Sequence, residues 1–336
     1  MGTTQRTRAE AGRDNDQMKI FAGRHTKALA RRICEHLGMA LGDAKTFEFP
    51  DGELLVKLDE DVRGRDCYVV LSTCEPVNDN VMELLIFIDC LRRASAQRVC
   101  AVLPYFGYGR QDRKDEGRVP ITAKLVANLI TGARADRVLA IDLHAAQIQG
   151  FFDLPMDHLT AAPVFLDYFR SIREELGDLC LVSPDVGNMK VAEKVANLLG
   201  GDLAIIHKQR LSGSHVVSSN LIGNVDGKTV LMFDDMISTA GTVCEAARLV
   251  KQRGAKRVIA AATHAVLVGP ALERLTAAPI DRIVVTDTIP IDGRCDVIRD
   301  RVTVLSVGPL LGDAIHNIHH NLSVSALFRD KVGPKR

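Results

Sequence analysis

The hydrophobic pattern alternates short apolar runs with amphipathic stretches along nearly the whole chain. The apolar runs are rich in Val, Ile and Leu, and they are almost continuous rather than interleaved with polar residues. Such runs are typical of parallel strands that are covered on both faces. We predict strands over 18–22, 67–72, 98–104, 137–144, 179–185, 203–208, 229–235, 257–266, 282–288 and 302–307.

Stretches with helical spacing of apolar residues lie between the predicted strands. One of them places Leu29, Ile33 and Leu37 four residues apart and ends on Gly38, which is typical of a helix C-terminus. We predict helices over 26–38, 78–94, 120–133, 188–201 and 239–255. The alternation of strand and helix predicts an α/β fold of doubly wound parallel sheets.

The chain is too long for one compact core. Its 336 residues exceed the ~250–300 residues beyond which a single hydrophobic core rarely grows. Segments 94–109 and 253–269 share a layout of small residue, basic residue, strand and glycine loop. We therefore predict two similar α/β domains, 18–160 and 161–336. The polar segment 1–17 lacks the apolar region of a secretory signal, and we expect a disordered extension there.

The composition excludes several classes of protein. A net charge of +1, 4% aromatic residues and no Trp argue against a dedicated nucleic-acid surface. No apolar stretch reaches the ~18 residues that a membrane span needs. The eight cysteines form no CxxC pair and no zinc-like spacing, so we expect reduced thiols in a cytoplasmic protein.

Polar side chains follow several predicted strands, and ligands of open parallel sheets bind at the carboxyl ends of strands. Asp142 and His144 are two residues apart at the end of one strand, where they can share a divalent cation; a structural histidine is the alternative. Asp185 ends another strand, before a helix whose N-terminus can receive an anion. A simple helix cap is the alternative for Asp185.

Basic residues follow two other strands. Lys208 and Arg210 lead into a Gly/Ser-rich segment that we predict as a mobile loop or a hairpin. Cations on such a loop suit the stabilisation of charge in a transition state, and a solvated basic turn is the alternative. Arg110 and Gln111 follow two tyrosine-containing turns that can flank a purine, and an exposed charged loop is the alternative. The chain contains no GxxxxGK[ST], which disfavours a phosphate-loop NTPase.

Two further segments favour structural roles. Residues 47–58 have a Pro-Asp-Gly-Glu turn between β-like runs and are predicted to form a hairpin. His316, His319 and His320 have helical spacing, but no carboxylate or cysteine completes a metal site, so we expect surface histidines there.

The segment TVLMFDDMISTAGT (229–242) combines groups suited to a phosphorylated sugar. Backbone amides from Ser238 to Thr242, near a helix N-terminus, can form an anion cradle, and Gly241 allows close approach. Asp234 and Asp235 can accept hydrogen bonds from a diol or bind Mg²⁺. Phosphate at one end and a diol at the other describe a ribose 5-phosphate.

Residues 234–242, DDMISTAGT, resemble the phosphoribosyl-pyrophosphate signature of type I phosphoribosyltransferases. Further segments match in the same order: FPDGE, YGRQDRK, DLHAAQIQGFF, SPDVGN and the Lys-x-Arg of HKQR. Together they resemble the class I ribose-phosphate pyrophosphokinase (phosphoribosyl-pyrophosphate synthetase) family from about Met18 to Phe328. The resemblance implies two doubly wound domains of the type I phosphoribosyltransferase kind, with ATP on the N-terminal side and ribose 5-phosphate on the C-terminal side.

That resemblance implies transfer of the β,γ-pyrophosphoryl group of ATP to the C1 hydroxyl of ribose 5-phosphate, with Mg²⁺. The implied catalytic residues are Lys208 and Arg210. The implied ATP contacts are Phe49, Asp51, Gly52, Glu53, Arg110, Gln111 and His144, with residues 49–53 reaching adenine from a neighbouring subunit. The implied ribose 5-phosphate contacts are Arg210, Asp234, Asp235, Ser238, Thr239, Ala240, Gly241 and Thr242. The implied metal ligands are His144, Asp142 and Asp185.

The resemblance also implies assembly and regulation. It suggests a homohexamer built from dimers, with neither nucleic acid nor membrane as a partner. Inorganic phosphate is the implied activator, and Gln149, Ser323 and Ser325 match the regulatory segment. The chain departs from the family pattern at three positions. It has Ser238 where many members have Asp, Asn188 where Gly is frequent, and Ala146 where some have Ser.

Two other functions compete with this one. A base phosphoribosyltransferase would share residues 234–242, but it needs neither FPDGE nor GRQDRK. A non-catalytic regulatory subunit of the same family would be expected to lack Lys208 or His144, or to carry an insertion in the loop after Arg210. Both residues are present, and the loop has no such insertion.

Overall fold

The computed structural model describes residues 17–184, 189–210, 217–291 and 293–329. These residues form two compact units. Of the described residues, the first unit contains those up to Thr160 and those from Val307 to Arg329, and the second is Ala161–Ser306. No helix of the described segments is long and apolar enough to cross a membrane.

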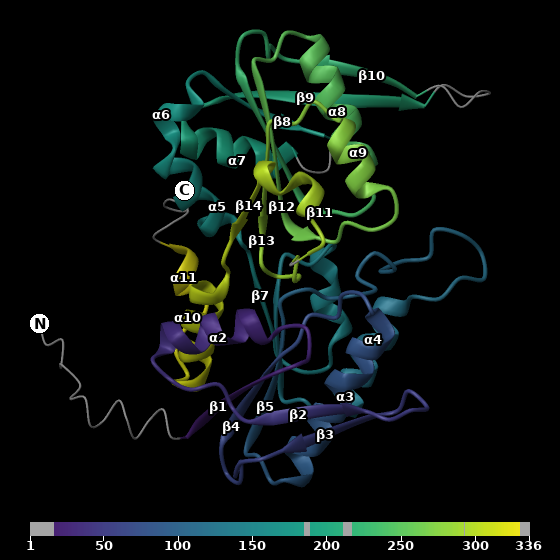
Figure 1. The fold of residues 1–336 in the computed structure, drawn as a ribbon, viewed down its shortest axis with the longest axis vertical. Helices are drawn as coiled ribbons and strands as arrows, with labels where there is room; N and C mark the ends of the chain where they lie inside the picture. The colour runs from purple at the N-terminus through teal and green to yellow at the C-terminus, as the bar shows by residue number, and fades with distance from the viewer. Residues whose placement is uncertain (1–16, 185–188, 211–216, 292, 330–336) are drawn as a thin grey trace, which may run out of the picture. The chain divides into compact units, whose positions relative to one another are not determined.

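The first unit contains a sheet of five parallel strands (Figure 1). Their order is β1 (Met18–Ala22), β4 (Asp66–Val70), β5 (Arg98–Leu103), β6 (Arg137–Ile141) and β7 (Met156–Leu159). Successive side chains of a strand point to opposite faces, and both faces are buried here. The apolar runs are therefore continuous, as parallel strands require.

Helices cover both faces of this sheet (Figure 1). The face that carries Val69, Ala101 and Val138 packs on α3 (Val77–Arg93) and α4 (Thr122–Gly132). On the other side lie α2 (Lys27–Leu37) and α10 (Gly308–His319). A separate antiparallel hairpin, β2 (Ala44–Glu48) and β3 (Leu54–Leu58), packs on α3, and it confirms the predicted hairpin.

The C-terminal segment belongs to the first unit, which differs from the prediction of a second domain over 161–336. The reason is the packing of α10 along α2. The two helices approach so closely that a Cβ at Gly312 would lie 2.7 Å from the His36 ring. His36 also hydrogen-bonds Asp313, with 2.7 Å between Nε2 and Oδ1. Hydrophobic periodicity locates a helix but not the sheet that it covers.

The second unit contains a sheet of seven strands. Their order is β10 (Val217–Ile222), β9 (Asp202–Arg210), β8 (Leu179–Ser183), β11 (Thr229–Ile237), β12 (Arg257–Ala265), β13 (Arg282–Thr286) and β14 (Val302–Leu305). Among the strand pairs that the described residues form in this sheet, only β9–β10 is antiparallel. The strand order reverses between β8 and β11, and open α/β sheets bind ligands beyond the carboxyl ends of the strands at such a point.

Helices also cover both faces of the second sheet (Figure 1). One face packs on α8 (Gly241–Gln252) and α9 (Ala271–Ala277). On the other, α7 (Met189–Leu199) contacts β8 and β9 and packs against α5 (Ala162–Ser171). The remaining short elements are α6 (Arg173–Leu176), α11 (Ala326–Arg329), and the 3₁₀ helices η1 (Ala146–Phe151) and η2 (Asp296–Arg301). The predicted α/β class with parallel sheets is confirmed.

Candidate functional site

The loop 238–242 connects β11 to α8, beside the reversal of strand order. Ala240 has a left-handed backbone with φ of 59°, and α8 then begins at Gly241 without a side-chain cap hydrogen bond. The first amides of an α-helix have no acceptor within the helix. Together with the helix dipole, they favour a bound anion such as phosphate. The predicted anion cradle thus lies at the ligand-binding edge of the sheet.

Backbone hydrogen bonds hold the start of this loop. The amide of Leu267 donates to the carbonyl of Ile237 at 2.9 Å, and the amide of Val268 donates to the carbonyl of Ser238 at 3.1 Å. A peptide carbonyl and the amide of the same unit point in opposite directions. Holding the carbonyls toward residues 267 and 268 therefore turns the following amides away from that segment.

The two adjacent carboxylates lie on β11, and this strand continues past its predicted end at Asp235 to Ile237. Asp234 and Asp235 are half-buried. The Asp235 amide donates to the Asp234 carboxylate at 2.9 Å, and the Met236 amide donates to the Asp235 carboxylate at 2.9 Å. A backbone donor thus stabilises each negative charge, which offsets part of the repulsion between neighbouring aspartates.

Lys208 and Arg210 lie within β9 rather than beyond its end. In the backbone ladder Lys208 is opposite Ser219 of β10. The antiparallel pairing of β9 and β10 shows that the chain forms a hairpin here, which was one of the two predicted alternatives. The connection 211–216 and the predicted ligand Asp185 lie outside the described residues.

In the first unit, the loops after β5 and β6 lie close together. A Cβ at Gly109 would be 3.8 Å from the Cβ of His144. The side-chain amide of Gln147 donates to the Asp112 carboxylate at 2.7 Å, which joins the two loops. The exposed residues 110–111 lie between these contacts. The structure therefore brings together three of the predicted ATP contacts.

The turn that carries Asp142 and His144 differs from the predicted strand. Strand β6 ends at Ile141, and Asp142 has a positive φ of 38°, so strand alternation does not place these two side chains. The amide of Leu143 instead donates to Nε2 of His158 at 2.9 Å. Burial lowers the pKa of His158, although Asp142 acts in the opposite direction.

His158 holds the turn between the predicted ligands Asp142 and His144, although the sequence did not predict a role for it. A lowered pKa keeps its ring neutral, with Nε2 available as an acceptor. The sequence carries no signal for this contact, because it joins residues in separate elements, fifteen positions apart.

The two tyrosines before Arg110 differ in exposure, and only Tyr108 is partly exposed. Tyr105 is buried in the core, and the Tyr108 hydroxyl donates to Asn78. The loop also passes close to Thr73, because a Cβ at Gly107 would lie 2.2 Å from the Thr73 carbonyl oxygen. Only glycine allows this approach.

The hairpin loop 49–53 is a compact turn. The amide of Phe49 donates to the carbonyl of Glu53 at 2.8 Å, and the amide of Gly52 donates to the carbonyl of Phe49 at 2.8 Å. The Asp51 carboxylate accepts a hydrogen bond from the Glu53 amide at 3.2 Å. Phe49 is 47% exposed. The turn thus presents an aromatic ring to solvent at a fixed position.

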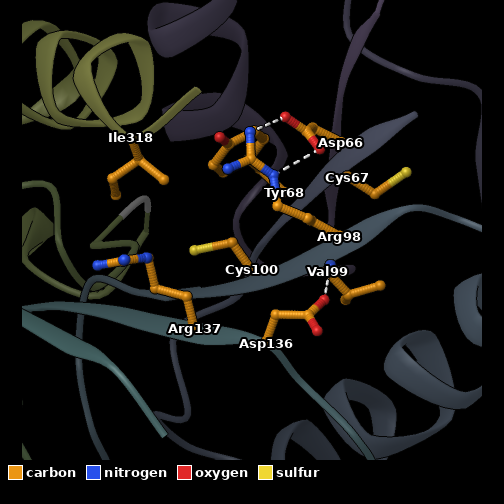
Figure 2. Close-up of a pocket in the computed structure, with 9 residues that line it drawn as sticks. All are labelled: Asp66, Cys67, Tyr68, Arg98, Val99, Cys100, Asp136, Arg137 and Ile318. Atoms are coloured by element: carbon orange, nitrogen blue, oxygen red, sulfur yellow. Dashed lines mark hydrogen bonds and ion pairs between the residues drawn. The ribbon is translucent and has the colours of Figure 1, made fainter. Parts of the chain in front are cut away.

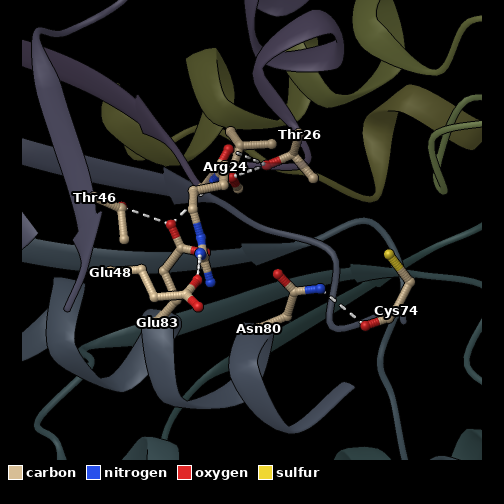
Figure 3. A network of polar contacts seen from close by, with 9 residues as sticks. Arg24, Thr26, Thr46, Glu48, Cys74, Asn80 and Glu83 are labelled. Carbon is tan, nitrogen blue, oxygen red and sulfur yellow. Dashed lines mark hydrogen bonds and ion pairs between the residues drawn. The ribbon is translucent and has the colours of Figure 1, made fainter. Parts of the chain in front are cut away.

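A buried carboxylate anchors the base of this hairpin (Figure 3). Glu83 of α3 is 0% exposed and accepts hydrogen bonds from the Thr46 hydroxyl at 2.7 Å and the Arg24 amide at 3.0 Å. The Arg24 guanidinium pairs with Glu83 at 3.4 Å and with Glu48 at 2.7 Å. Because Glu48 directly precedes Phe49, this network ties the start of the loop to α3.

A pocket of about 120 Å³ opens at the starts of β4, β5 and β6 (Figure 2). Its lining includes Asp66, Tyr68, Arg98 and Ile318. It lies at the opposite end of these strands from residues 110 and 144, and no predicted substrate ligand lines it.

An ion-pair cluster beside this pocket holds the end of α10. Nε of Arg98 donates to Asp66 at 2.7 Å, and Nδ1 of His319 lies 2.7 Å from the same carboxylate. Burial alone would raise the pKa of Asp66, but the hydrogen bonds from Arg98 and His319 lower it to about 2. The side chain of His319 is 8% exposed, so the expectation of a surface histidine is wrong there.

The predicted regulatory residues form local contacts. The hydroxyls of Ser323 and Ser325 are 2.9 Å apart, and the Ser323 carbonyl accepts from Asn317 at 3.1 Å. Gln149 donates to the Ala146 carbonyl at 2.9 Å. Within the part of the chain that the structure describes, no hydrogen bond joins Gln149 to either serine.

The donor set near His144 is small. Among the described residues, no three side chains of His, Cys, Asp or Glu gather to hold a metal. Asp142 and His144 supply one carboxylate and one imidazole. Mg²⁺ usually binds through one or two carboxylates, several waters and substrate phosphates. The residues therefore fit Mg²⁺ that arrives with a nucleotide rather than a metal cage made of protein.

Comparisons with known proteins cover nearly the whole chain. Residues 18–133 match the model of the N-terminal domain of ribose phosphate pyrophosphokinase, and residues 214–329 match the phosphoribosyl synthetase-associated domain. The crystal structure of phosphoribosylpyrophosphate synthetase from Mycobacterium smegmatis is similar, with a TM-score of 0.84 and 43% identity. It covers 91% of this chain and 99% of that one.

Curated relatives agree with these matches. The ribose-phosphate pyrophosphokinase of Rhodopirellula baltica is 58% identical over 94% of this chain and 99% of the relative. The protein of the same name from Synechocystis sp. is 49% identical over 97% of both chains. The fold and these matches define an α/β protein of the phosphoribosyl-synthetase class. The chain belongs to the ribose-phosphate pyrophosphokinase family.

Proposed function

We propose that this chain is an enzyme that transfers the β,γ-pyrophosphoryl group of ATP to the C1 hydroxyl of ribose 5-phosphate. The C1 oxygen forms a bond to the β-phosphorus of ATP, the bond from that phosphorus to the oxygen retained by AMP breaks, and the C1 hydroxyl loses its proton. The products are 5-phosphoribosyl 1-pyrophosphate and AMP. The observation that carries this proposal is the 58% identity to a ribose-phosphate pyrophosphokinase over 94% of the chain.

On the ATP side, the proposed contacts are residues 49–53, Arg110, Gln111 and His144. The exposed ring of Phe49 provides a flat apolar surface for adenine. Arg110 supplies a cation for phosphate oxygens. Mg²⁺, when bound, neutralises phosphate charge during the transfer. Asp142, His144 and Asp185 are the residues that would hold it.

On the ribose side, the amides of residues 238–242 hold the 5-phosphate, and Asp234 and Asp235 accept hydrogen bonds from the ribose hydroxyls. Ser238 is compatible with this role, because the proposed cradle uses backbone amides, which every residue except proline provides. Lys208 and Arg210 neutralise the charge that develops on the pentavalent phosphorus. Phosphoryl-type transfer mainly requires that the substrates are positioned and that their charge is neutralised. In this proposal, residues of the chain meet both requirements.

We further propose a cytoplasmic location and a homohexamer built from dimers. The eight cysteines are free thiols, which suits a reducing compartment. In a hexamer, loop 49–53 would reach adenine bound by a neighbouring subunit. Inorganic phosphate is the proposed activator, with Gln149, Ser323 and Ser325 as its contacts.

The decisive assay supplies the full-length chain with ATP, ribose 5-phosphate and Mg²⁺. AMP and phosphoribosyl pyrophosphate should appear in equal amounts, as measured by anion-exchange chromatography, and EDTA should stop their formation. The absence of AMP, both with and without inorganic phosphate, would overturn the proposal. Consumption of phosphoribosyl pyrophosphate with a free base, independent of ATP, would instead identify a base phosphoribosyltransferase.

Lys208→Ala should lower kcat by about 1,000-fold, because a preorganised cation is worth ~10²–10³ in rate. Ribose 5-phosphate binding, measured by calorimetry, should survive. An unchanged kcat would show that the Lys208 side chain does not take part in catalysis.

A further inference from the structure

Residues 267–274 run alongside the phosphate loop and hold it at three successive points. The first two contacts are the backbone amides of Leu267 and Val268, which bind the carbonyls of residues 237 and 238. The third is a side chain: Nη1 of Arg274, on α9, donates to the carbonyl of Thr239 at 3.0 Å. Three consecutive carbonyls of the loop are thus bound by one neighbouring segment.

The third contact lies where the loop is most constrained. Residue 240, which follows Thr239, has the left-handed backbone, a conformation that costs non-glycine residues free energy. A Cβ at Gly241 would lie 3.3 Å from Nη1 of Arg274, so the guanidinium also borders the first residue of α8. Arg274 therefore binds the residue before Ala240 and lies next to the residue after it.

This contact has an electrostatic consequence as well. A carbonyl oxygen carries partial negative charge, and an unbound one beside a phosphate would repel it. The guanidinium binds the Thr239 oxygen and adds a positive charge within the same loop environment. Both effects favour an anion at the amides of residues 239–242.

We propose that Arg274 is a positioning residue for the 5-phosphate of ribose 5-phosphate, acting through the carbonyl of Thr239. This inference rests on the proposed function for the identity of the ligand. Arg274 takes no part in the chemical step, so its loss should change ribose 5-phosphate affinity and leave ATP affinity and kcat nearly intact.

A matched control exists on the neighbouring helix. Arg248 of α8 is also exposed, and burial raises the pKa of Cys244 while Arg248 and Arg274 both act to lower it. The two arginines are thus within electrostatic range of the same thiol. No described hydrogen bond links Arg248 to the loop. Arg248→Met therefore removes the same charge from the same region without removing the contact to Thr239.

The experiment measures ribose 5-phosphate binding to the full-length chain by calorimetry, and KM and kcat for both substrates. Arg274→Met should weaken ribose 5-phosphate binding and raise its KM by about five- to tenfold, as expected for loss of a charged hydrogen bond. The KM for ATP and the kcat should change less than about twofold, and Arg274→Lys should recover part of the affinity. Arg248→Met should match the wild type.

Two results would overturn the inference. One is equal ribose 5-phosphate affinity in Arg274→Met and the wild type. The other is equal weakening in Arg248→Met, which would indicate general electrostatics rather than the contact to Thr239. Thermal unfolding of each variant separates a folding defect from a binding defect, and Arg274→Lys provides a folded test if Arg274→Met unfolds. Because calorimetry needs no turnover, wild-type binding without AMP formation would refute the proposed function alone.

Discussion

The phosphate loop 238–242 of the second unit and the hairpin loop 49–53 of the first are held by different kinds of contact. Backbone amides and one arginine hold the phosphate loop through its carbonyls. Side-chain ion pairs around Glu83 hold the base of the hairpin loop (Figure 3).

That difference has consequences for mutation. A backbone contact survives most side-chain changes, because every residue except proline keeps its amide. A buried ion pair fails when one partner is lost, because the other charge remains without compensation. The phosphate loop should therefore tolerate substitution of Leu267 and Val268, which hold it through their backbone amides, whereas the hairpin loop should not tolerate loss of Arg24.

The largest expected effect on substrate binding concerns the ribose contacts proposed on β11. Asp234→Asn and Asp235→Asn each keep an oxygen that can accept the neighbouring backbone amide, so the fold should persist. Each should raise the KM for ribose 5-phosphate by about 30- to 100-fold, because a charged hydrogen-bond acceptor is lost. Steady-state kinetics should show the KM for ATP nearly unchanged. A rise in the KM for ATP alone would contradict the assignment of substrates to the two units.

The next effect tests the hairpin anchor. Arg24→Met leaves the Glu83 carboxylate buried with only the Thr46 hydroxyl and the residue 24 amide as donors. The free energy of unfolding should fall by roughly 2 kcal/mol, less than for a fully buried pair because Arg24 is partly hydrated. Urea unfolding measures this change.

The control for Arg24 is an exposed pair on α3. Arg93 pairs with Asp89 at 2.6 Å, but the Arg93 side chain is 79% exposed. Arg93→Met should leave the urea midpoint nearly unchanged. Equal destabilisation by Arg24→Met and Arg93→Met would show that the buried carboxylate does not anchor the hairpin.

A pH-dependent effect is expected at the cluster beside the pocket in Figure 2. Hydrogen bonds from Arg98 and His319 lower the pKa of Asp66 to about 2 despite its burial, below the ordinary value of ~3.9. The ionised carboxylate therefore stabilises the fold above pH ~4, and this contribution is lost as the pH falls toward 2. Asp66→Asn should be less stable than the wild type at pH 7. The difference, measured by urea unfolding, should shrink between pH 4 and pH 3; a constant difference would exclude the carboxylate charge as its cause.

The smallest effect tests the tolerance of the phosphate loop. Val268→Ala keeps the amide that donates to Ser238. The KM for ribose 5-phosphate should stay within about twofold of the wild type, since no hydrogen bond is lost. A change as large as that expected for Arg274→Met would show that side-chain packing, rather than the backbone, holds this part of the loop.

Much of the fold could be predicted from the sequence. Continuous apolar runs require strands covered on both faces, and the runs over 98–104 and 257–266 became β5 and β12 almost as predicted. The acidic pair and the Ser/Thr/Gly loop of 234–242 stood out because their chemistry is local. Such signals depend on residues that are neighbours in the chain.

Contacts between distant residues were decided only by the tertiary structure. His319 hydrogen-bonds Asp66, and Arg274 hydrogen-bonds Thr239, because packing brings separate elements together. The observed strand ends also differ from the predicted ones. Strand β6 stops at Ile141, where the backbone turns, rather than at residue 144. Periodicity specifies which face of an element is buried, but not which element covers it. By itself the sequence determined the fold class, the motifs and the family resemblance; only packing decided which side chains hold the two site loops, because those contacts depend on the topology of the sheets and helices.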